Sequence, residues 1–350
     1  TTDLLLTQWA NDPTSLLQIL VELQRRYHHI PPPSIYRLSR ALNITPAQIK
    51  AVISFYSFLQ LEPDADYTVL FSDNIIDQMQ GGRERAQQLA YELGHELVNP
   101  LQEKPPQNLA RVGFTACIGM SDQGPAALVN GITIPRITPQ RVSQMAQLIQ
   151  QRKPLADWPA DWFEVNGSIH RKDSLLNTEL SAGSAIQAAL DSGSEGVLQN
   201  LAASGLRGCG GAGFQTASKW RMCAETRQSD RVIVCNADEG EPGTFKDRLL
   251  LQCYAERLFE GMTVCAATIG ANQGFVYLRA EYRYLLESLQ ALLKQRRAQN
   301  LLGKNILGQS GFDFDIQIHL GAGAYICGEE SALIESLEGK RGIPRNRPPF

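Results

Sequence analysis

Three stretches of this chain combine glycines with polar and charged side chains in spacings that suit binding of a phosphate-bearing cofactor. The first stretch is residues 205–220, GLRGCGGAGFQTASKW. Its glycines Gly208, Gly210 and Gly213 spell the dinucleotide fingerprint G-x-G-x-x-G, which needs a strand before the first glycine and a helix after the last. The residues around the loop therefore decide which phosphate it could bind.

The segment before the loop lacks the pattern of a strand. Residues 194–203 predict a helix, with Ser194 as its N-terminal cap and Gly205 placed to end it. A Rossmann unit also carries an acidic residue about 20 positions beyond the loop, whereas Asp238 falls later, at the end of the next predicted strand. This context disfavours a Rossmann turn.

The loop nevertheless has the chemistry of a phosphate nest. Its five glycines in nine residues leave backbone N–H groups unshielded, and Thr216 and Lys219 add a hydroxyl and a cation. A flexible glycine loop without a ligand is the alternative. The combination of donors and cation favours a phosphate-bearing cofactor.

The second stretch, residues 235–248, follows a predicted apolar strand and reads CNADEGEPGTFKDR. Open α/β sheets bind ligands at the carboxyl ends of their strands, where this stretch begins. The amide of Asn236 can both donate and accept, as recognition of a heterocycle requires. A solvated acidic turn is the alternative. The acidic residues of the stretch are Asp238, Glu239 and Glu241.

The third stretch, residues 321–342, reads GAGAYICGEESALIESLEGKRG. Its glycines would let the backbone approach a ligand, and Glu329 and Glu330 open a predicted helix, where carboxylates suit the helix dipole. Acidic residues are common at helix starts, so this stretch alone is weak evidence for a ligand site and supports one only together with the other two.

An α/β domain from residue 185 onward would position all three stretches. The chain there alternates between apolar runs of strand length and amphipathic helical patterns. The predicted strands are residues 231–239, 274–281 and 314–322, and the predicted helices are residues 194–203, 247–269, 282–298 and 329–338.

The front half of the chain has a different pattern. Residues 12–62 predict a compact helical segment, in which Asp12-Pro13 and Thr45-Pro46 each supply a cap and a first-turn proline. Residues 67–150 follow the order β-α-β-β-α of a small thioredoxin-like domain. We therefore expect residues 1–150 to hold the helical segment and this domain, residues 151–184 to be a linker draped on a neighbour, and residues 185–350 to form the cofactor-binding α/β domain.

Composition narrows the class of function. The 350 residues carry a net charge of −3, which provides no basic field for nucleic acid. We find no apolar run of membrane-spanning length and no charged start of a signal peptide, so we expect a cytoplasmic protein. Seven scattered cysteines without a C-x-x-C pair favour a reducing compartment. The five histidines show no metal-ligand spacing, and no metal site is predicted.

Together the three stretches resemble the family of flavoprotein (diaphorase) subunits found in respiratory complex I, NAD-reducing hydrogenases and NAD-linked formate dehydrogenases, over about residues 185–350. That family folds as a non-classical Rossmann-like α/β domain in which the loop and the acidic turn hold FMN, with NADH stacked above it. The resemblance implies FMN contacts at Gly208, Gly210, Gly211, Gly213, Lys219, Asn236, Asp238, Glu239, Gly328 and Glu329, cofactor contacts at Ala212 and Tyr325, and NADH contacts at Phe214, Lys219, Glu241, Glu330 and Phe350. Glu239 and Glu241, as the catalytic candidates, would tune the flavin potential and orient the nicotinamide.

Residues 12–150 resemble the thioredoxin-like partner subunit of the same complexes, which binds a [2Fe-2S] cluster through C-x4-C and C-x3-C pairs. Here Ser72 and Asp77 stand at the first pair, with Gly81 at the family glycine, and Cys117 and Met120 at the second. Since four thiolates are the usual ligand set, we expect no cluster in this domain.

A fused front domain without cluster ligands is similar to the diaphorase subunits of soluble NAD-reducing [NiFe] hydrogenases. This implies an iron–sulfur electron-transfer subunit and hydrogenase subunits as partners, with a formate dehydrogenase or complex I subunit as alternatives. Family members continue into a Cys-rich domain with a [4Fe-4S] cluster, so we expect the native chain to continue past Phe350. Cys209 replaces the family's usual arginine. A non-catalytic assembly module that has lost its flavin is the remaining alternative.

Overall fold

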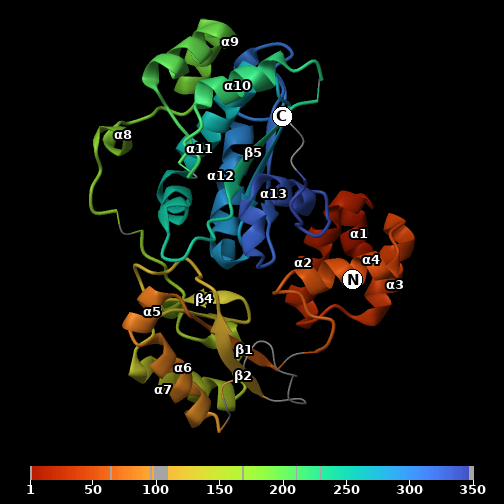
Figure 1. Cartoon of the computed structure of the whole chain (residues 1–350), viewed down its shortest axis with the longest axis vertical. Helices are drawn as coiled ribbons and strands as arrows, with labels where there is room; N and C mark the ends of the chain where they lie inside the picture. Colours follow the sequence, from red (N-terminus) through yellow and green to blue (C-terminus); the bar gives the residue numbers. More distant parts are fainter. Residues whose placement is uncertain are drawn as a thin grey trace.

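The computed structural model describes residues 2–63, 65–94, 97, 109–167, 169–209, 211–228 and 230–346. Figure 1 shows three bodies: a helical bundle (residues 2–62) at the right, a thioredoxin-like domain (67–150) at the bottom and a C-terminal domain (184–346) at the top. The predicted α/β class is confirmed, because helices pack on two separate sheets. Among the described helices, none has the length and hydropathy needed to cross a membrane.

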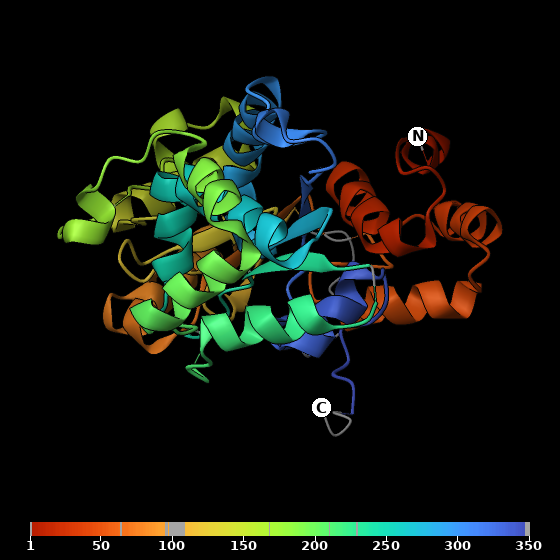
Figure 2. The same cartoon turned by 90° about the horizontal axis from the view of Figure 1, so that it is seen from above.

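The helical bundle forms as its caps and prolines predict. The side chain of Asp12 accepts from Thr14 N, and Thr45 forms a capping box with Gln48. The bundle's apolar faces meet in one core, and Figure 2 shows it standing to one side of the rest of the chain. Its elements are α1 (Thr2–Gln8), η1 (Pro13–Ser15), α2 (Leu16–Tyr27), α3 (Pro32–Leu42) and α4 (Pro46–Phe55).

The thioredoxin-like domain has the predicted order β-α-β-β-α with two additions, the short helix α5 and a further strand, because residues 127–134 form two strands, β3 and β4. Its four-stranded sheet has the order β2-β1-β3-β4, in which β1 runs parallel to β2 and antiparallel to β3. The elements are β1 (Tyr67–Ser72), α5 (Ile75–Met79), α6 (Gly82–Glu92), β2 (Ala110–Thr115), β3 (Ala127–Val129), β4 (Ile132–Ile134) and α7 (Pro139–Gln150).

The segment after α7 contains short helical turns and no strand among its described residues. Trp158 and Trp162 are both buried in the core of the thioredoxin-like domain, so this part of the segment is anchored on its neighbour, as expected. The turns are η2 (Leu155–Asp157), η3 (Ala160–Trp162) and α8 (Ser174–Asn177).

The C-terminal domain is built on a parallel sheet of order β5-β6-β7. α9 is kinked at Gly193, where φ is 67°, and ends at Gly205 in the left-handed conformation, which confirms the predicted helix before the glycine loop. The elements are α9 (Ser184–Ser204), α10 (Thr216–Glu225), β5 (Val232–Ala237), α11 (Lys246–Ile269), β6 (Gln273–Leu278), η4 (Ala280–Leu285), α12 (Leu286–Ala298), η5 (Ile306–Gly308), β7 (Asp315–Leu320), η6 (Tyr325–Gly328) and α13 (Glu330–Leu337).

The two faces of this sheet pack against different layers. Val276 and Leu278 on β6 belong to the core shared with α11 and α12, whereas Tyr277 between them packs into the core of the helical bundle. His319 stacks on Tyr277 with ring centroids 5.7 Å apart. Burial lowers the pKa of His319 to about 3, so this histidine is a neutral core residue.

Polar contacts join the helical bundle to β7 and α13 of the C-terminal domain. The side chain of Gln18 donates to Leu320 O at 2.9 Å and accepts from Leu320 N at 3.0 Å. Tyr56 donates to the hydroxyl of Ser336 on α13 at 2.8 Å. The bundle is therefore fixed to β7, which directly precedes the third stretch, and to α13 within it.

A buried ion pair ties three helices of the C-terminal domain together. Glu260 on α11 accepts from Gly183 N and Ala185 N at the start of α9, both at 3.1 Å. Arg296 on α12 donates to Glu260 at 2.7 Å, and its side chain is fully buried. The carboxylate thus caps one helix while it neutralises a cation from another.

We predict that Glu260→Ala lowers the free energy of unfolding of the C-terminal domain by about 3–5 kcal/mol, because it leaves a buried guanidinium without its main counter-charge. Chemical denaturation followed by circular dichroism measures the change. Glu195→Ala is the matched control: Glu195 pairs with Arg221 on the surface, where the loss should be small. Equal losses in the two variants would contradict the assigned role of Glu260.

Candidate functional site

The second and third stretches meet at the carboxyl edge of the parallel sheet. Asn236, at the end of β5, donates from Nδ2 to Gly328 O at 2.8 Å, and its Oδ1 accepts from Asp238 N at 3.1 Å. A Cβ at Gly328 would lie 3.3 Å from Asp238 O, so the glycine permits this close approach. Two segments about 90 residues apart are therefore joined as the motif predicts, in agreement with the general position of ligand sites in open α/β sheets.

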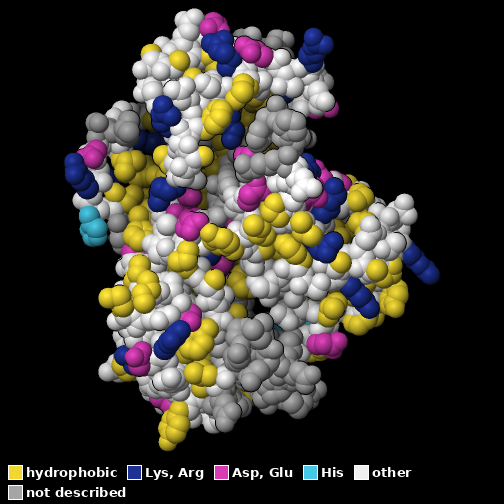
Figure 3. Space-filling view, in the orientation of Figure 1, with side chains coloured by type: hydrophobic (Ala, Val, Ile, Leu, Met, Phe, Trp, Pro, Cys, Tyr) yellow, Lys and Arg dark blue, Asp and Glu magenta, His cyan; other side chains and the backbone are white. Residues whose placement is uncertain are grey.

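Tyr325 and Glu241 form the exposed rim of this edge. The Tyr325 hydroxyl donates to Glu241 Oε1 at 2.6 Å, and this hydrogen bond raises the pKa of Tyr325. A Cβ at Gly240 would lie 2.8 Å from the Tyr325 ring, so the ring packs directly on the turn. Tyr325 is 59% exposed, and Figure 3 shows apolar side chains gathered over η6 and α13 with acidic side chains beside them. The rim thus presents an aromatic face and a carboxylate together.

Asp238 has an unpartnered polar atom at the centre of the turn. Its Oδ2 is buried and has no hydrogen-bond donor in the described chain. Burial, and then the charge of Glu281, raise the pKa of Asp238 to about 7, although Arg279 opposes the shift. A buried carboxyl oxygen without a donor is costly, and a ligand hydroxyl or N–H would satisfy it.

Glu239 lies behind the turn, turned toward α11. Its Oε1 accepts from Asp247 N at 3.0 Å, and its Oε2 accepts from Arg248 N at 3.3 Å and from the Tyr282 hydroxyl at 2.9 Å. The carboxylate therefore caps the start of α11 and holds the turn in place. Its predicted direct contact with a cofactor stays a prediction, and in the structure Glu239 acts as a positioning residue.

The glycine loop projects as a short hairpin between α9 and α10. An antiparallel bridge joins Arg207 to Gln215, and Gly208 N donates to Phe214 O at 2.9 Å. Gly211 and Gly213 have φ of 99° and 59°, values that side chains with a Cβ rarely adopt. Thr216 N, the first N–H of this ten-residue helix, donates to Leu206 O at 3.0 Å. Gln215 caps α10 without a side-chain hydrogen bond, so among the described residues the next N–H groups, of Ala217 and Ser218, are available to an anion.

Lys246 links the glycine loop to the acidic turn, and its role was not apparent from the sequence. Burial lowers its pKa, but the hydrogen bond with Asp247, the negative charges of Asp247 and Glu239 and the interaction with Cys209 together raise the pKa above its usual value. The electrostatic interaction with Cys209 indicates that Lys246 lies near the glycine loop. The T-F-K-D-R run around Lys246 gives no local indication of a role for this lysine, because its contribution depends on segments that lie apart in the sequence.

The structure places the remaining predicted residues as follows. Glu329 caps α13 by accepting from Ser331 N and Ala332 N at 2.9 and 3.0 Å, while Glu330 is exposed in the first turn. Phe214 is 48% exposed beside the loop, and Ala212 and Lys219 are also exposed. Gly210 and Phe350 lie outside the described residues.

The thioredoxin-like domain forms the rear wall of the acidic turn. Arg279, which follows β6, donates to the carbonyl oxygens of both Glu239 and Cys117, the latter at 2.7 Å, and forms a buried ion pair with Glu281. Gly243 N, just beyond the turn, donates to Cys117 Sγ at 3.4 Å. These contacts join residues 117 and 239–243 across two domains, and periodicity alone did not reveal them.

Gly119 lets Tyr282 reach the turn. Its φ is 75°, and a Cβ there would lie 2.6 Å from Cε1 of Tyr282. The tyrosine ring therefore passes directly over the Gly119 backbone on its way to Glu239. The loop of the front domain, the tyrosine and the carboxylate form one continuous contact.

The positions of the former cluster ligands are occupied by a hydrogen-bonded polar network. Ser72 donates to Asp77 Oδ2 at 2.8 Å, Asn74 donates to the same oxygen, and Ala126 N donates to Asp77 Oδ1 at 3.2 Å. The carboxyl is fully buried, and burial raises its pKa. A [2Fe-2S] cluster does not fit these donors, because its ligands are thiolates.

The fourth ligand position needs a correction. A C-x3-C spacing counted from Cys117 ends at Ser121, so Met120 was assigned wrongly. The structure agrees, because Cys117 Sγ lies 3.8 Å from the Ser121 hydroxyl, whereas Met120 is buried in the apolar core shared with the C-terminal domain. The corrected set still contains one thiol, and no group of three or more metal-binding side chains occurs in the described part of the chain.

Two protein-family models match the chain. Residues 201–350 match the Nuo51 FMN-binding domain, and residues 3–150 match the thioredoxin-like [2Fe-2S] ferredoxin family. The first match covers all three stretches. The second agrees with the observed fold of the front domain, whose four ligand positions here are Ser72, Asp77, Cys117 and Ser121.

We predict that this chain binds no [2Fe-2S] cluster after anaerobic reconstitution with iron and sulfide, since it offers one of four thiolates. The triple variant Ser72→Cys, Asp77→Cys and Ser121→Cys is the matched positive control, and we expect it to bind about two irons per chain. Iron analysis and electron paramagnetic resonance of the reduced proteins give the answer. Two irons per unmodified chain would refute the prediction.

Relatives over the whole chain are subunits of NAD-reducing hydrogenases. The chain is 39% identical to the alpha subunit of the NAD-reducing hydrogenase HoxS of Cupriavidus necator, over 99% of this chain and 59% of that protein. It is 48% identical to an NADH-quinone oxidoreductase component of Aquifex aeolicus, over 47% of this chain and 38% of that one. The crystal structure of an NAD+-reducing [NiFe]-hydrogenase in the H2-reduced state superposes with a TM-score of 0.84 at 41% identity, over 97% of this chain and 57% of the other.

The chain thus spans between half and two thirds of the length of the hydrogenase subunits it matches. The matches include the glycine loop, the acidic turn and the Gly328–Glu329 segment, of which the structure joins the last two at one sheet edge, and they extend through the front domain. Residues 3–150 therefore belong to the thioredoxin-like [2Fe-2S] ferredoxin family and residues 201–350 to the Nuo51 FMN-binding family.

Proposed function

We propose that this chain binds FMN and NADH and acts as the diaphorase part of an NAD-linked hydrogenase. One observation carries the proposal: the buried Oδ2 of Asp238 lacks a donor, among the described residues, at the sheet edge where Asn236 and Gly328 are joined. A ligand with hydroxyl or N–H groups at this edge would satisfy that oxygen. A non-catalytic assembly module would not need a ligand at this oxygen, because a site that no longer binds flavin would be expected to lose a buried carboxyl group without a hydrogen-bond donor.

The residues at this edge fit FMN. The N–H groups of the glycine loop and of the start of α10, with Lys219 and Lys246, would receive the phosphate. Asn236, Asp238 and the Gly328 segment would bind the ribityl chain and the flavin ring, with Glu329 fixing the start of α13. When bound, FMN supplies hydride exchange with the nicotinamide and release of two electrons one at a time.

The protein's own contribution is position and charge. Glu239 holds the turn through α11 and Tyr282, while Glu241 and Tyr325 form the exposed rim above it. We assign the NADH contacts to the residues that the resemblance places around this rim, and these are Phe214, Lys219, Glu241, Glu330 and Phe350. The Glu241 carboxylate beside the nicotinamide would favour the oxidised, cationic ring and so promote departure of the hydride.

The whole assembly is part of the same proposal. We assign as partners an iron–sulfur electron-transfer subunit and the hydrogenase subunits, in a cytoplasmic complex, and we divide the chain at residues 150 and 185. Similarity over 99% of the chain to a hydrogenase subunit supports this choice. A complex I flavoprotein subunit is the second candidate, supported by higher identity over about half of the chain. The front domain favours the hydrogenase, because the hydrogenase match includes it.

We predict that the purified chain is yellow, with the absorption of bound flavin near about 450 nm, and that NADH reduces a dye in its presence. Gly211→Ala should weaken FMN binding at least about tenfold, because φ of 99° is strained for alanine and the loop would shift. Fluorescence titration of the FMN-free protein measures the affinity.

Gly303→Ala is the matched control for this test. Gly303 has a similar φ of 102° and open space around it, and it lies far in sequence from the proposed site, where it pairs with Phe314. We expect Gly303→Ala to retain the affinity for FMN. A colourless protein that binds no added FMN would support the assembly module instead.

We also predict that Glu330→Ala relaxes the preference for NADH over NADPH. A carboxylate at the adenosine ribose accepts from the 2′-hydroxyl and repels a 2′-phosphate, so its removal should raise kcat/KM with NADPH about tenfold. Dye reduction with the two nucleotides gives the ratio. Glu287→Ala on α12, also an exposed glutamate in a first helical turn, is the control. An unchanged NADPH rate in Glu330→Ala would remove this residue from the site.

A further inference from the structure

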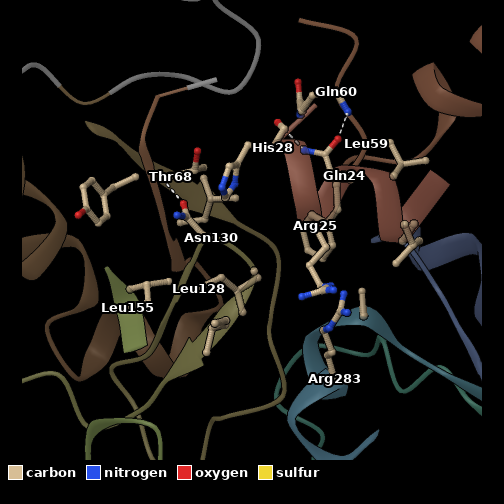
Figure 4. Close-up of a pocket in the computed structure, with 18 of the residues that line it drawn as sticks. Gln24, Arg25, His28, Leu59, Gln60, Thr68, Leu128, Asn130, Leu155 and Arg283 are labelled. Atoms are coloured by element: carbon tan, nitrogen blue, oxygen red, sulfur yellow. Dashed lines mark hydrogen bonds between the residues drawn. The ribbon is translucent and has the colours of Figure 1, made fainter. Parts of the chain in front are cut away.

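A cavity of about 800 Å³ lies where the helical bundle, the thioredoxin-like domain and the C-terminal domain meet. Its wall includes α2 and residues 57–60 of the bundle, β1 and residues 128–132 of the thioredoxin-like domain, and Ala280, Arg283, Gly321 and Ala322 of the C-terminal domain. Figure 4 shows residues from the bundle and the thioredoxin-like domain on opposite sides of an open space. None of the described residues assigned to FMN and NADH lines this wall.

Two of the four arginines in the described wall of this cavity lie together at one end. Arg25 on α2 and Arg283 on η4 point toward each other from different domains (Figure 4). Glu22 is the counter-ion of three arginines, because it pairs with Arg25 at 2.6 Å, with Arg26 at 2.7 Å and with Arg283 at 3.7 Å. Hydrogen bonds from Arg25 lead the effects that lower the pKa of Glu22 to about 2, so it is ionised and the group retains two positive charges.

Arg283 has the strongest need of a ligand. Its side chain is 32% exposed, and its guanidinium donates no hydrogen bond to any residue that the structure describes, with Glu22 at ion-pair distance. Burial, and then the charge of Arg25, lower the pKa of Arg283. Glu22 shares its charge among three arginines, so a further anion between Arg25 and Arg283 would be stabilising.

The rest of the cavity wall combines apolar surface with a few polar groups. Phe58, Leu59 and Leu128 contribute apolar surface, and Arg111 and the ion pair of Arg152 with Asp66 also line the wall. Figure 4 shows Thr68, Asn130 and Leu128 on the side of the cavity opposite Arg25. Asn130 is fixed in place by accepting from Thr68 N at 2.7 Å and donating to Asp66 O at 3.0 Å. A concave, largely apolar site with a small number of placed polar groups is typical of small-molecule binding.

We propose that this junction binds a small phosphate monoester with an apolar or aromatic body, whose phosphate lies between Arg25 and Arg283. A phosphate monoester carries close to two negative charges at neutral pH, which matches the excess of this arginine group. Guanidinium groups bind phosphate oxygens through paired N–H donors. Nε and Nη2 of Arg25 donate to Glu22 at 2.9 and 2.6 Å, so Nη1 of Arg25 and the guanidinium of Arg283 would contact the phosphate from two domains. The ligand would therefore link the bundle to the C-terminal domain, and its binding would stabilise their docking.

The test uses the full native chain in its complex, loaded with FMN, and phenyl phosphate as the probe. We expect isothermal titration calorimetry to show one site per chain, retained with saturating NAD+ present. Arg283→Gln should weaken this binding about tenfold to a hundredfold, as expected for loss of hydrogen bonds to a charged group. Arg37→Gln, which removes an exposed arginine of α3 that pairs with Asp3, should leave it unchanged.

Thermal unfolding without phosphate adds an independent readout. Arg283→Gln should leave the melting temperature of the unliganded protein unchanged or higher, because it removes a cation that faces Arg25, and it should abolish the rise that phenyl phosphate causes in the native protein. Equal affinity in Arg283→Gln, or a lower melting temperature of that variant without ligand, overturns the proposal. Absence of phenyl phosphate binding overturns the proposal as well. So does binding of phenyl phosphate that is no tighter than that of inorganic sulfate and is lost at physiological salt.

Discussion

The guanidinium of Arg279 is the group on which the arrangement of this molecule depends. It is buried, it pairs with Glu281, and its remaining donors reach carbonyl oxygens in two different domains, at Glu239 and Cys117. A buried cation requires all of its partners, since each missing acceptor costs about 1–3 kcal/mol or more. The acidic turn, the end of β6 and the loop of the front domain therefore have one satisfactory arrangement relative to one another.

Local sequence pattern was sufficient to predict most of the helices and strands and to single out the three stretches that carry the candidate site. The periods of β5, β6 and β7, and the caps at Asp12 and Thr45, were visible in the sequence because each depends on neighbours a few residues away. The helix before the glycine loop was equally local, and it was the observation that argued against a Rossmann turn. Contacts within one element or one motif were thus predictable.

The contacts that could not be predicted from local sequence pattern join segments that lie far apart in the chain. Arg279 and Cys117 are 162 residues apart, and nothing in the sequence around either residue indicates the other. Glu239 shows the same limit: its motif gives an acidic residue near a ligand, but the approach of Tyr282 and α11 decides where the carboxylate points. Lys246 acquires its place beside Cys209 in the same way. The orientation of these side chains depends on tertiary packing, which local sequence pattern does not contain.

The anchored segment after α7 changes the thermodynamics of docking between the front and C-terminal domains. Trp158 and Trp162 fix its first part to the thioredoxin-like domain, so a short tether separates that domain from α9. If the two domains were separate chains, the same contacts would be lost more readily on dilution. A short tether instead holds the effective concentration of one domain near the other on the order of millimolar. Mutations that weaken the interface are therefore tolerated here more readily than between separate chains. A domain that has exchanged its metal ligands for Ser72 and Asp77 can persist as a permanently attached wall of the neighbouring site.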